Sequence, residues 1–283
     1  MNFKTRSIII SIVFSWPLYS FMLYFLTMRS SLTGGTRFWI CFGGGLVISM
    51  LMVFGIQLFS ANTRNQNAIE GELEKNGYSD RFIELSQAEV NRLSSKRPYQ
   101  QYYIRYVINL ANAYLYKKEP YQALEAINML NPNYLKHNTV KSNPVELAQL
   151  LSYYSVQMCI CEDLNDLQRA HNVMNDAEPI LEKCKGKGTA TDIISDEMNV
   201  TYCCLCGDFE TAMDYAEHTM VRSIKGQEYI GYALRAKVFL KMGNLREARK
   251  NLDIATGYAK KKLEMDYIEQ FDEKLKEAER NIY

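Results

Sequence analysis

Two long uncharged stretches near the N-terminus constrain this chain more than any other feature. The first, SIIISIVFSWPLYSFMLYFLTM, covers residues 7–28, and the second, FWICFGGGLVISMLMVFGIQLF, covers residues 38–59. Each holds 22 residues without Asp, Glu, Lys or Arg, and an α-helix needs about 20 apolar residues to cross the hydrocarbon of a bilayer. The sequence therefore predicts two transmembrane helices, at about 7–28 and 38–59.

A nine-residue segment, RSSLTGGTR, separates the two stretches. Arg29 and Arg37 stand at its ends, and Gly34-Gly35 suits a turn. Because so short a connection joins antiparallel neighbours, residues 1–59 are predicted to form a two-helix membrane hairpin. Pro17 lies within the first stretch, where a membrane helix tolerates proline because neighbouring groups satisfy the freed backbone carbonyl.

The two apolar stretches have two other interpretations. A cleaved signal peptide would begin with a basic segment such as the one containing Lys4 and Arg6. The first stretch is longer than a signal-peptide core, lacks a small-residue cleavage pattern and is followed at once by a second span. A hairpin in the core of a soluble protein is disfavoured because both helices are apolar all round.

Charge and cysteine usage indicate where the chain resides. Four basic residues near the spans lie on the side of the termini and two in the connection, which favours cytoplasmic termini under the positive-inside rule. Seven cysteines without the spacing of a secreted scaffold fit a reducing compartment. A net charge of +1 gives no global attraction to nucleic acid. The expected location is the plasma membrane of a bacterium, with the termini and the body in the cytoplasm.

The body of the chain after residue 59 repeats a short pattern. GDFETAMDYA begins at Gly207 and GNLREARKNLDIA begins at Gly243. In each, Gly is followed by Asp or Asn, an apolar residue, and an alanine five residues after the Gly, namely Ala212 and Ala248. Glycine ends one helix or turns the chain, and a small alanine lets the next helix pack closely. The pattern predicts helical hairpins.

This pattern resembles the tetratricopeptide repeat, a helical hairpin of 34 residues with small and aromatic residues at fixed positions. With the alanine at position 20, four units begin at Ile104, Leu151, Ile193 and Tyr229. Only the last two units have the turn glycine at position 15. The resemblance implies an all-α fold, in which the hairpin is followed by a tetratricopeptide-like α-solenoid. The position-20 alanines are Ala123, Ala170, Ala212 and Ala248.

The predicted domains follow from this layout. Residues 1–59 are the two spans, and 60–101 are a polar linker and a leading helix that starts at a Ser79/Asp80 N-cap signal. Residues 102–260 hold the four divergent repeats. Residues 261–283 are a C-terminal capping helix whose apolar residues recur at steps of three and four.

The resemblance also implies a binding groove, because positions 2, 5, 9, 12 and 13 of each first helix line the concave surface in that family. In this chain the groove would have basic ends around an acidic centre, and it would suit an extended peptide or a partner helix with a basic centre. The predicted partner-binding residues are Arg105, Asn112, Tyr116, Ser155, Cys159, Glu162, Glu197, Thr201, Cys204, Lys237 and Lys241.

The stretch YCCLCGDFETAMDYAEH, which starts at Tyr202, poses the question of a metal site. A zinc site needs about four convergent nitrogen or sulfur ligands, whereas adjacent cysteines on a helix point about 100° apart. The cysteines are therefore interpreted as structural thiols, with no metal and no cofactor. No nucleophile elbow or HExxH motif occurs, and the chain is not expected to be an enzyme.

The sequence thus predicts a membrane-anchored scaffold that binds a protein or peptide partner in a cytoplasmic groove, without nucleic acid. Three alternatives stay open. In the first alternative, the protein is an accessory subunit of a membrane complex, with Gly43, Gly44 and Gly45 as a small-residue packing face. Alternatively, it is a thiol or metal sensor that uses Cys159 and Cys204, or its solenoid is a self-association module.

Overall fold

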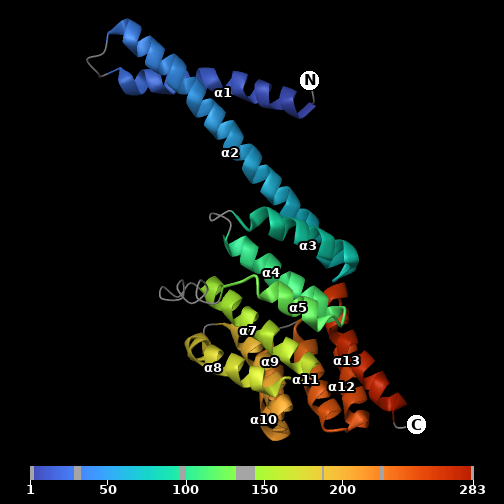
Figure 1. Ribbon diagram of the computed structural model, residues 1–283. Helices are drawn as coiled ribbons and strands as arrows, with labels where there is room; N and C mark the ends of the chain where they lie inside the picture. The colour runs from blue at the N-terminus through green and yellow to red at the C-terminus, as the bar shows by residue number, and fades with distance from the viewer. Residues whose placement is uncertain are drawn as a thin grey trace. The chain divides into compact units, whose positions relative to one another are not determined.

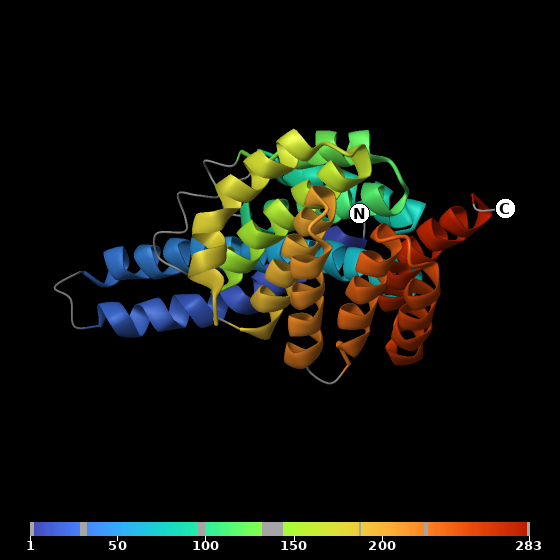
Figure 2. The ribbon, with the colours of Figure 1, turned by 90° about the horizontal axis from the view of Figure 1, so that it is seen from below.

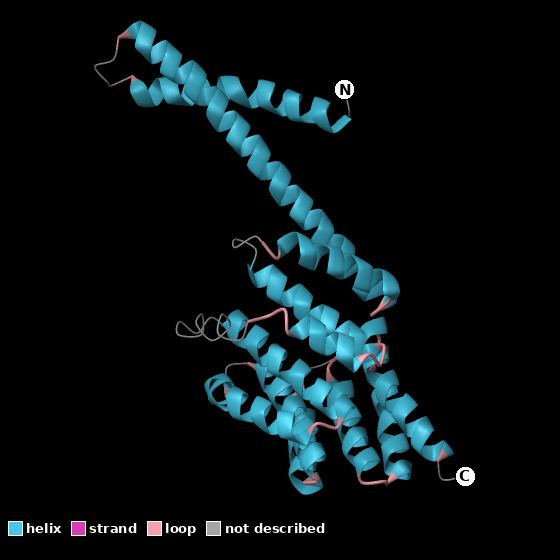
Figure 3. Ribbon diagram, in the orientation of Figure 1, coloured by secondary structure: helices cyan, strands magenta, loops and turns pink. Residues whose placement is uncertain are grey.

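The computed structural model describes residues 3–28, 33–95, 100–131, 144–186, 188–223 and 226–281, with side chains outside the description at 3–11, 13–14, 37, 54–63, 100, 144–146 and 189. Within these ranges the regular elements are α-helices and no strand is present (Figure 3). The predicted all-α class is confirmed. The chain divides into two compact units, Met1–Ala68 and Ile69–Tyr283, which are described separately.

Unit 1 contains helix α1 (Phe3–Thr27) and most of α2 (Gly34–Asn76). The Ser15 hydroxyl donates a 2.9 Å hydrogen bond to Ser49 Oγ, and Trp16 Nε1 donates one of 2.9 Å to the Phe42 carbonyl. Near the other end of α1, Thr27 Oγ1 lies 3.6 Å from Cys41 Sγ. As the residue number on α1 rises from Ser15 to Thr27, the number of its partner on α2 falls from Ser49 to Cys41. The two helices therefore run antiparallel.

The glycines of α2 explain how closely α1 approaches. A side-chain carbon added at Gly45 would lie 2.8 Å from the backbone nitrogen of Ser20, which is too close for any residue but glycine. A carbon added at Gly44 would meet the Leu23 side chain at 3.0 Å, whereas one at Gly43 would meet nothing within 4 Å. Gly44 and Gly45 therefore lie against α1 within the hairpin, whereas the space beside Gly43 is empty.

The described surface of unit 1 is strongly apolar. Among the described residues, one helical stretch, Gly34–Val53, is long and apolar enough to cross a membrane by length and composition. It overlaps the second predicted span. The first predicted span includes residues 7–11, 13 and 14, whose side chains lie outside the description. Side chains that are more than half exposed include Leu18, Phe21, Met22, Phe25, Leu26, Met28, Phe38, Trp39, Val47 and Leu51.

The first part of the predicted polar linker, from residue 60 to residue 76, is helical. Helix α2 continues without a break to Asn76 because the segment is rich in helix formers and lacks proline. It ends at Gly77, whose φ of +65° is the left-handed conformation that commonly terminates helices. The last turns of α2, from Ile69 onward, belong to unit 2.

Unit 2 begins its own packing with helix α3 (Asp80–Leu93). The Ser79 hydroxyl accepts a 3.1 Å hydrogen bond from the amide of Phe82, so the predicted N-cap is confirmed. The buried face of α3, which includes Phe82, Val90 and Leu93, packs against α4.

Helical hairpins then stack along unit 2, as expected of a helical-repeat fold (Figure 1). Each first helix contacts its own second helix and the next first helix. The two helices of the four predicted units are α4 (Gln100–Tyr116) and α5 (Pro120–Ile127), α7 (Pro144–Leu164) and α8 (Leu167–Cys184), α9 (Thr189–Cys206) and α10 (Phe209–Arg222), and α11 (Glu228–Lys241) and α12 (Leu245–Tyr258).

The position-20 alanines occupy the same place in every unit. All four are fully buried, at 0% exposure. In each unit the alanine amide donates to the carbonyl of the residue four before it, at 3.0 or 3.1 Å, and that residue is the N-cap of the second helix. These donor–acceptor pairs are Ala123–Glu119, Ala170–Asp166, Ala212–Asp208 and Ala248–Asn244.

The turn between the two helices is also shared, even where the glycine is missing. Position 15 has a positive φ in all four units: 59° at Lys118, 52° at Asn165, and 76° at both Gly207 and Gly243. In each unit the amide of position 16 donates a 2.9 Å hydrogen bond to the carbonyl of position 11. Asparagine tolerates this conformation, whereas at Lys118 it costs about 1 kcal/mol, which the packing of the hairpin offsets.

Successive position-20 alanines lie 47, 42 and 36 residues apart rather than the 34 of the repeat, and this spacing predicts longer inter-repeat loops at residues 136–146 and 184–192. Helix α8 extends to Cys184 and α9 begins at Thr189, so the second of these segments is helical at both of its ends. The segment expected at 136–146 falls mostly within 132–143, outside the described residues.

The chain ends in helix α13 (Lys262–Arg280), which packs beside α11 and α12 (Figure 2). Its predicted apolar stripe is buried at Ile268, Phe271 and Leu275. The same steps of three and four continue from Leu275 to Ala278, which is half-buried, and to Ile282, which lies outside the described residues. Helix α13 also contacts α7 and α9 through polar side chains, which are described with the candidate site below.

Candidate functional site

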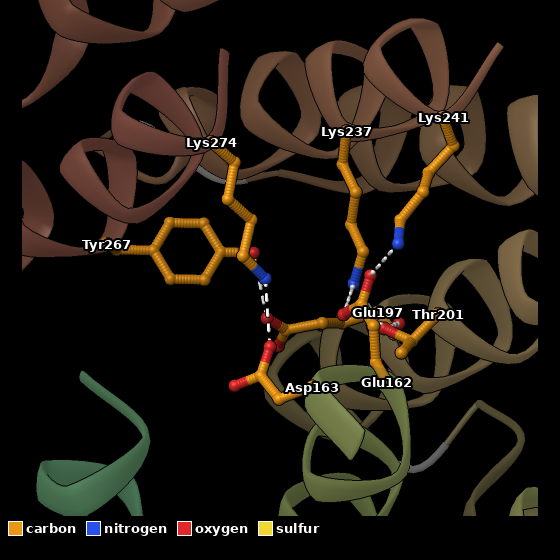
Figure 4. Close-up of polar contacts among 8 residues, drawn as sticks. All are labelled: Glu162, Asp163, Glu197, Thr201, Lys237, Lys241, Tyr267 and Lys274. Atoms are coloured by element: carbon orange, nitrogen blue, oxygen red, sulfur yellow. Dashed lines mark hydrogen bonds and ion pairs between the residues drawn. The ribbon is translucent and has the colours of Figure 1, made fainter. Parts of the chain in front are cut away.

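Three successive first helices bring a polar side chain to one buried point (Figure 4). Glu162 comes from α7, Thr201 from α9 and Lys237 from α11. The Lys237 ammonium lies 2.7 Å from Glu162 Oε2 and donates a 2.8 Å hydrogen bond to Thr201 Oγ1. The side chains of Glu162 and Lys237 are each 6% exposed. The face of α7, α9 and α11 that carries this cluster and contacts α13 is called the inner face below.

The charges of this cluster stabilise one another. Burial alone would raise the pKa of Glu162, but the nearby charges of Lys237, Lys274 and Lys241 lower that pKa to about 2. Burial alone would lower the pKa of Lys237, but the Glu162 carboxylate outweighs it and raises the pKa. The pair is therefore ionised at neutral pH. Lys241 completes the cluster, with its ammonium 3.4 Å from Glu162 Oε1.

Helix α13 contributes two donors to the same face (Figure 4). The Tyr267 hydroxyl donates a 2.8 Å hydrogen bond to Glu197 Oε1 on α9. Lys274 Nζ lies 3.0 Å from Asp163 Oδ1, at the end of α7. Burial raises the pKa of Glu197, despite the hydrogen bond from Tyr267.

The Lys237 ammonium also lies 5.9 Å from the centre of the Phe271 ring. The buried cluster therefore lies directly beside α13.

The acidic residues at the centre of the predicted groove have partners within the chain. Glu162, Asp163 and Glu197 each have a basic or hydroxyl partner within the chain. The acidic charges are met by Lys237 and by α13, so in this structure the inner face is occupied by the chain's own last helix. The sequence did not indicate this, because the partners lie 70 or more residues apart.

The other predicted site residues are less closely connected. Arg105 is exposed and its guanidinium lies 2.9 Å from Glu70 Oε1, away from the cluster. The Tyr116 hydroxyl donates a 3.3 Å hydrogen bond to Glu269 of α13. Asn112 and Ser155 are half-buried on α4 and α7.

The predicted cysteines lie close to the cluster but are weakly acidic. Cys159 and Cys204 both interact electrostatically with Lys237. Burial nevertheless raises the pKa of Cys159 to about 12 and that of Cys204 to about 11. Since the thiolate is the reactive form, these side chains behave as buried thiols. All seven cysteines of the chain, which all lie in the described ranges, are free.

A second contact of α13 was missed at the sequence level. The Asp266 carboxylate is 1% exposed and lies against Gly77, where an added side-chain carbon would be 1.8 Å from Asp266 Oδ2. Lys262, one turn earlier on α13, forms an ion pair with Asp266 Oδ1. The turn signal at Gly77 is visible in the sequence, but its contact with Asp266 is not.

The described acidic, cysteine and histidine side chains also bear on metal binding. In the part of the chain that the structure describes, no group of three or more His, Cys, Asp or Glu side chains is arranged to hold a metal ion. His171 accepts or donates a 2.8 Å hydrogen bond at its Nδ1 with the Tyr202 hydroxyl. His218 is exposed, and His137 lies outside the described residues.

Comparison with protein-family models, with curated proteins and with solved structures found no match.

Proposed function

We propose that this protein is a membrane-anchored adaptor of tetratricopeptide type, which holds a protein partner at the membrane through its inner face. In this proposal α1 and the first part of α2 span the plasma membrane of a bacterium as a two-helix hairpin. The termini and unit 2 lie in the cytoplasm. The chain supplies a binding surface, and the proposal assigns it no catalytic chemistry.

The observation that carries the proposal is the exposed apolar surface of unit 1. Apolar patches of this extent mark membrane or partner contacts, and Phe21, Phe25 and Trp39 are each more than half exposed on helices that already pack against each other. The hydrogen bonds of Ser15 and Trp16 lie between the helices, so polar groups are kept within the hairpin. A helix pair of this kind suits a lipid environment.

The repeat assignment rests on positions that recur in all four units. The buried alanine at position 20, the positive φ at position 15 and the hydrogen bond from position 16 to position 11 are the same in each. Repeats of this type build extended surfaces for protein partners, and this supports binding rather than catalysis.

One alternative has an observation in its favour. Gly43 lies on α2 with nothing within 4 Å of its added side-chain carbon, so it offers a site where another membrane helix approaches closely. An accessory subunit of a membrane complex would use this site. The thiol-sensor alternative is disfavoured, because burial raises the pKa of both Cys159 and Cys204.

Affinity capture of the full-length protein from its native membrane tests the proposal. The inner-face variant combines Lys241→Glu, which lies in the cluster on α11, with Arg105→Glu, which lies beyond the inner face on α4 at the other end of the predicted groove. The matched control combines Arg81→Glu with Lys250→Glu, whose side chains are 64% and 67% exposed in local ion pairs. A partner held by the wild type and the control, and reduced about tenfold with the folded inner-face variant, supports the proposal. Equal recovery with all three proteins contradicts it.

The proposed orientation, with unit 2 in the cytoplasm, predicts which cysteines react from outside the cell. Cys206 is the one cysteine classed as exposed, and a membrane-impermeant maleimide should label it only after the cells are permeabilised. The exposed Thr33 precedes α2 in the connection between the spans, so a Thr33→Cys variant on a Cys206→Ser background should be labelled in intact cells. The opposite pattern, with Cys206 labelled in intact cells, would place unit 2 outside.

A further inference from the structure

Helix α13 carries three rows of side chains that match the inner face and its surroundings. Ile268, Phe271 and Leu275, at steps of three and four, are buried. Tyr267 and Lys274, seven residues apart, donate to carboxylates of α9 and α7. Residues at these spacings lie on one side of a helix.

A third row of α13 is acidic and meets donors at the end of α4. The Tyr116 hydroxyl donates to Glu269 at 3.3 Å, and the Lys118 ammonium lies 2.9 Å from Glu273 Oε2. The inner face and the end of α4 together thus contact a helix that has a row of donors, a row of carboxylates and an apolar row. The rows span residues 267–275, about two turns.

The docking of α13 has one defect. Asp266 is 1% exposed, and neither of its carboxylate oxygens has a hydrogen bond of good geometry among the described residues. Its compensation is the ion pair with Lys262, whose side chain is 46% exposed, and the nearby Tyr116 hydroxyl. The carboxylate also lies against Gly77 at the C-terminal end of α2, where the helix dipole disfavours negative charge.

The remaining polar contacts of α13 to α4 and α7 are partly exposed. The side chains of the Lys118–Glu273 and Lys274–Asp163 pairs are 24–60% exposed, and ion pairs of that kind contribute little. A helix without a carboxylate at the Asp266 position would keep all three rows and lose the defect. The chain's own helix is therefore a weaker occupant than the face allows.

We propose that the inner face is a docking site for an amphipathic helix of a partner protein, and that α13 is a built-in competitor which the partner displaces. This inference rests on the proposed function and specifies its partner. The partner helix has apolar residues at i, i+3 and i+7, a donor at i−1 and a Lys or Arg at i+6. It has acidic residues at i+1 and i+5, and an uncharged residue at i−2, where α13 has Asp266.

The test uses full-length protein in detergent and fluorescent peptides. One peptide has the sequence of residues 261–281, a second carries Asp266→Ala, and a scrambled peptide is the control. Phe271→Asp with Leu275→Asp in the protein releases α13. Lys274→Glu is a milder releasing variant, and Lys276→Glu is its matched control because the described ion pair of Lys276 is with Asp272 on the same helix.

An attached helix competes at an effective concentration in the millimolar range. The variant with Phe271→Asp and Leu275→Asp should therefore bind the native-sequence peptide at least about tenfold more tightly than the wild type does. Lys274→Glu, which removes a partly exposed ion pair, should bind it a few-fold more tightly than Lys276→Glu does. The Asp266→Ala peptide should bind several-fold more tightly than the native-sequence peptide, because it lacks the poorly compensated buried carboxylate. Circular dichroism verifies that each variant is folded.

Several results would overturn the inference. A folded releasing variant that binds neither peptide has no helix site on its inner face. A partner that is still lost with the inner-face variant would then leave the proposed function standing. Equal affinity of wild type and releasing variants means that α13 does not compete. A dimer in light scattering that both releasing variants abolish would make a second copy the occupant. Peptide binding without any captured partner would overturn the proposed function, and with it the partner helix as the occupant of this face.

Discussion

Replacing Lys237 with methionine should lower the free energy of unfolding by about 3–5 kcal/mol, because it leaves the Glu162 carboxylate buried without its main counter-charge. Both side chains are only 6% exposed, and the ammonium also donates to Thr201. Lys241 is then the lysine of α11 that remains near the carboxylate, at 3.4 Å from Glu162. Urea unfolding of the full-length protein in detergent, followed by circular dichroism, measures the loss.

Two variants show whether the cause is the buried charge. Lys241→Met removes a lysine that is 37% exposed from the same carboxylate and should cost no more than about 1 kcal/mol. Lys237→Met combined with Glu162→Leu should recover most of the loss, since an apolar pair of similar volume often replaces a buried ion pair without penalty. Equal losses for Lys237→Met and Lys241→Met would contradict the cluster as described.

Gly77→Ala should cost about 2–4 kcal/mol, by two separate effects. The left-handed backbone at φ +65° is strained by about 1–2 kcal/mol for a residue with a side chain. The added carbon would also lie 1.8 Å from Asp266 Oδ2, so α13 must shift, as in overpacked cores. Unfolding in urea gives the total, and faster hydrogen exchange at the amides of α13 localises the shift.

Two glycines separate these effects. Gly243 has a φ of +76° and open space around its added carbon, so Gly243→Ala should cost only the strain, about 1–2 kcal/mol. Gly71 lies within α2 with nothing within 4 Å, so Gly71→Ala should stabilise the helix by about 0.5–1 kcal/mol. Asp266→Ala added to Gly77→Ala should relieve the clash. Equal costs for Gly77→Ala and Gly243→Ala would contradict the contact with Asp266.

Local features of this chain were predictable. The helical hairpins, the Ser79 N-cap and the buried alanines follow from capping chemistry and from periodic apolar residues, which act over a few positions. The shared turn was only partly visible, because Lys118 and Asn165 adopt a glycine-like φ that neither residue signals. The helical continuation of α2 to Asn76 was missed because polar composition alone was interpreted as a linker.

The candidate site was predicted in its parts but not in its arrangement. Position 9 and position 12 of successive first helices marked Glu162, Thr201 and Lys237 as neighbours on one face, and the structure brings them into contact. Their mutual neutralisation was not apparent, because opposite charges on separate repeats can face either each other or a ligand. The structure distinguishes these two arrangements, because it shows the Glu162 and Lys237 side chains in contact and nearly excluded from solvent.

By itself, the sequence of this protein determined that it would be helical, where its helices would turn, and that its N-terminal segment would be apolar on every side. These properties depend on interactions between residues a few positions apart. The tertiary structure alone decided that α13 would lie on the inner face and that Gly77 would meet Asp266. Such contacts join residues about 70 to 190 positions apart, and their formation depends on the summed geometry of every helix pair in between.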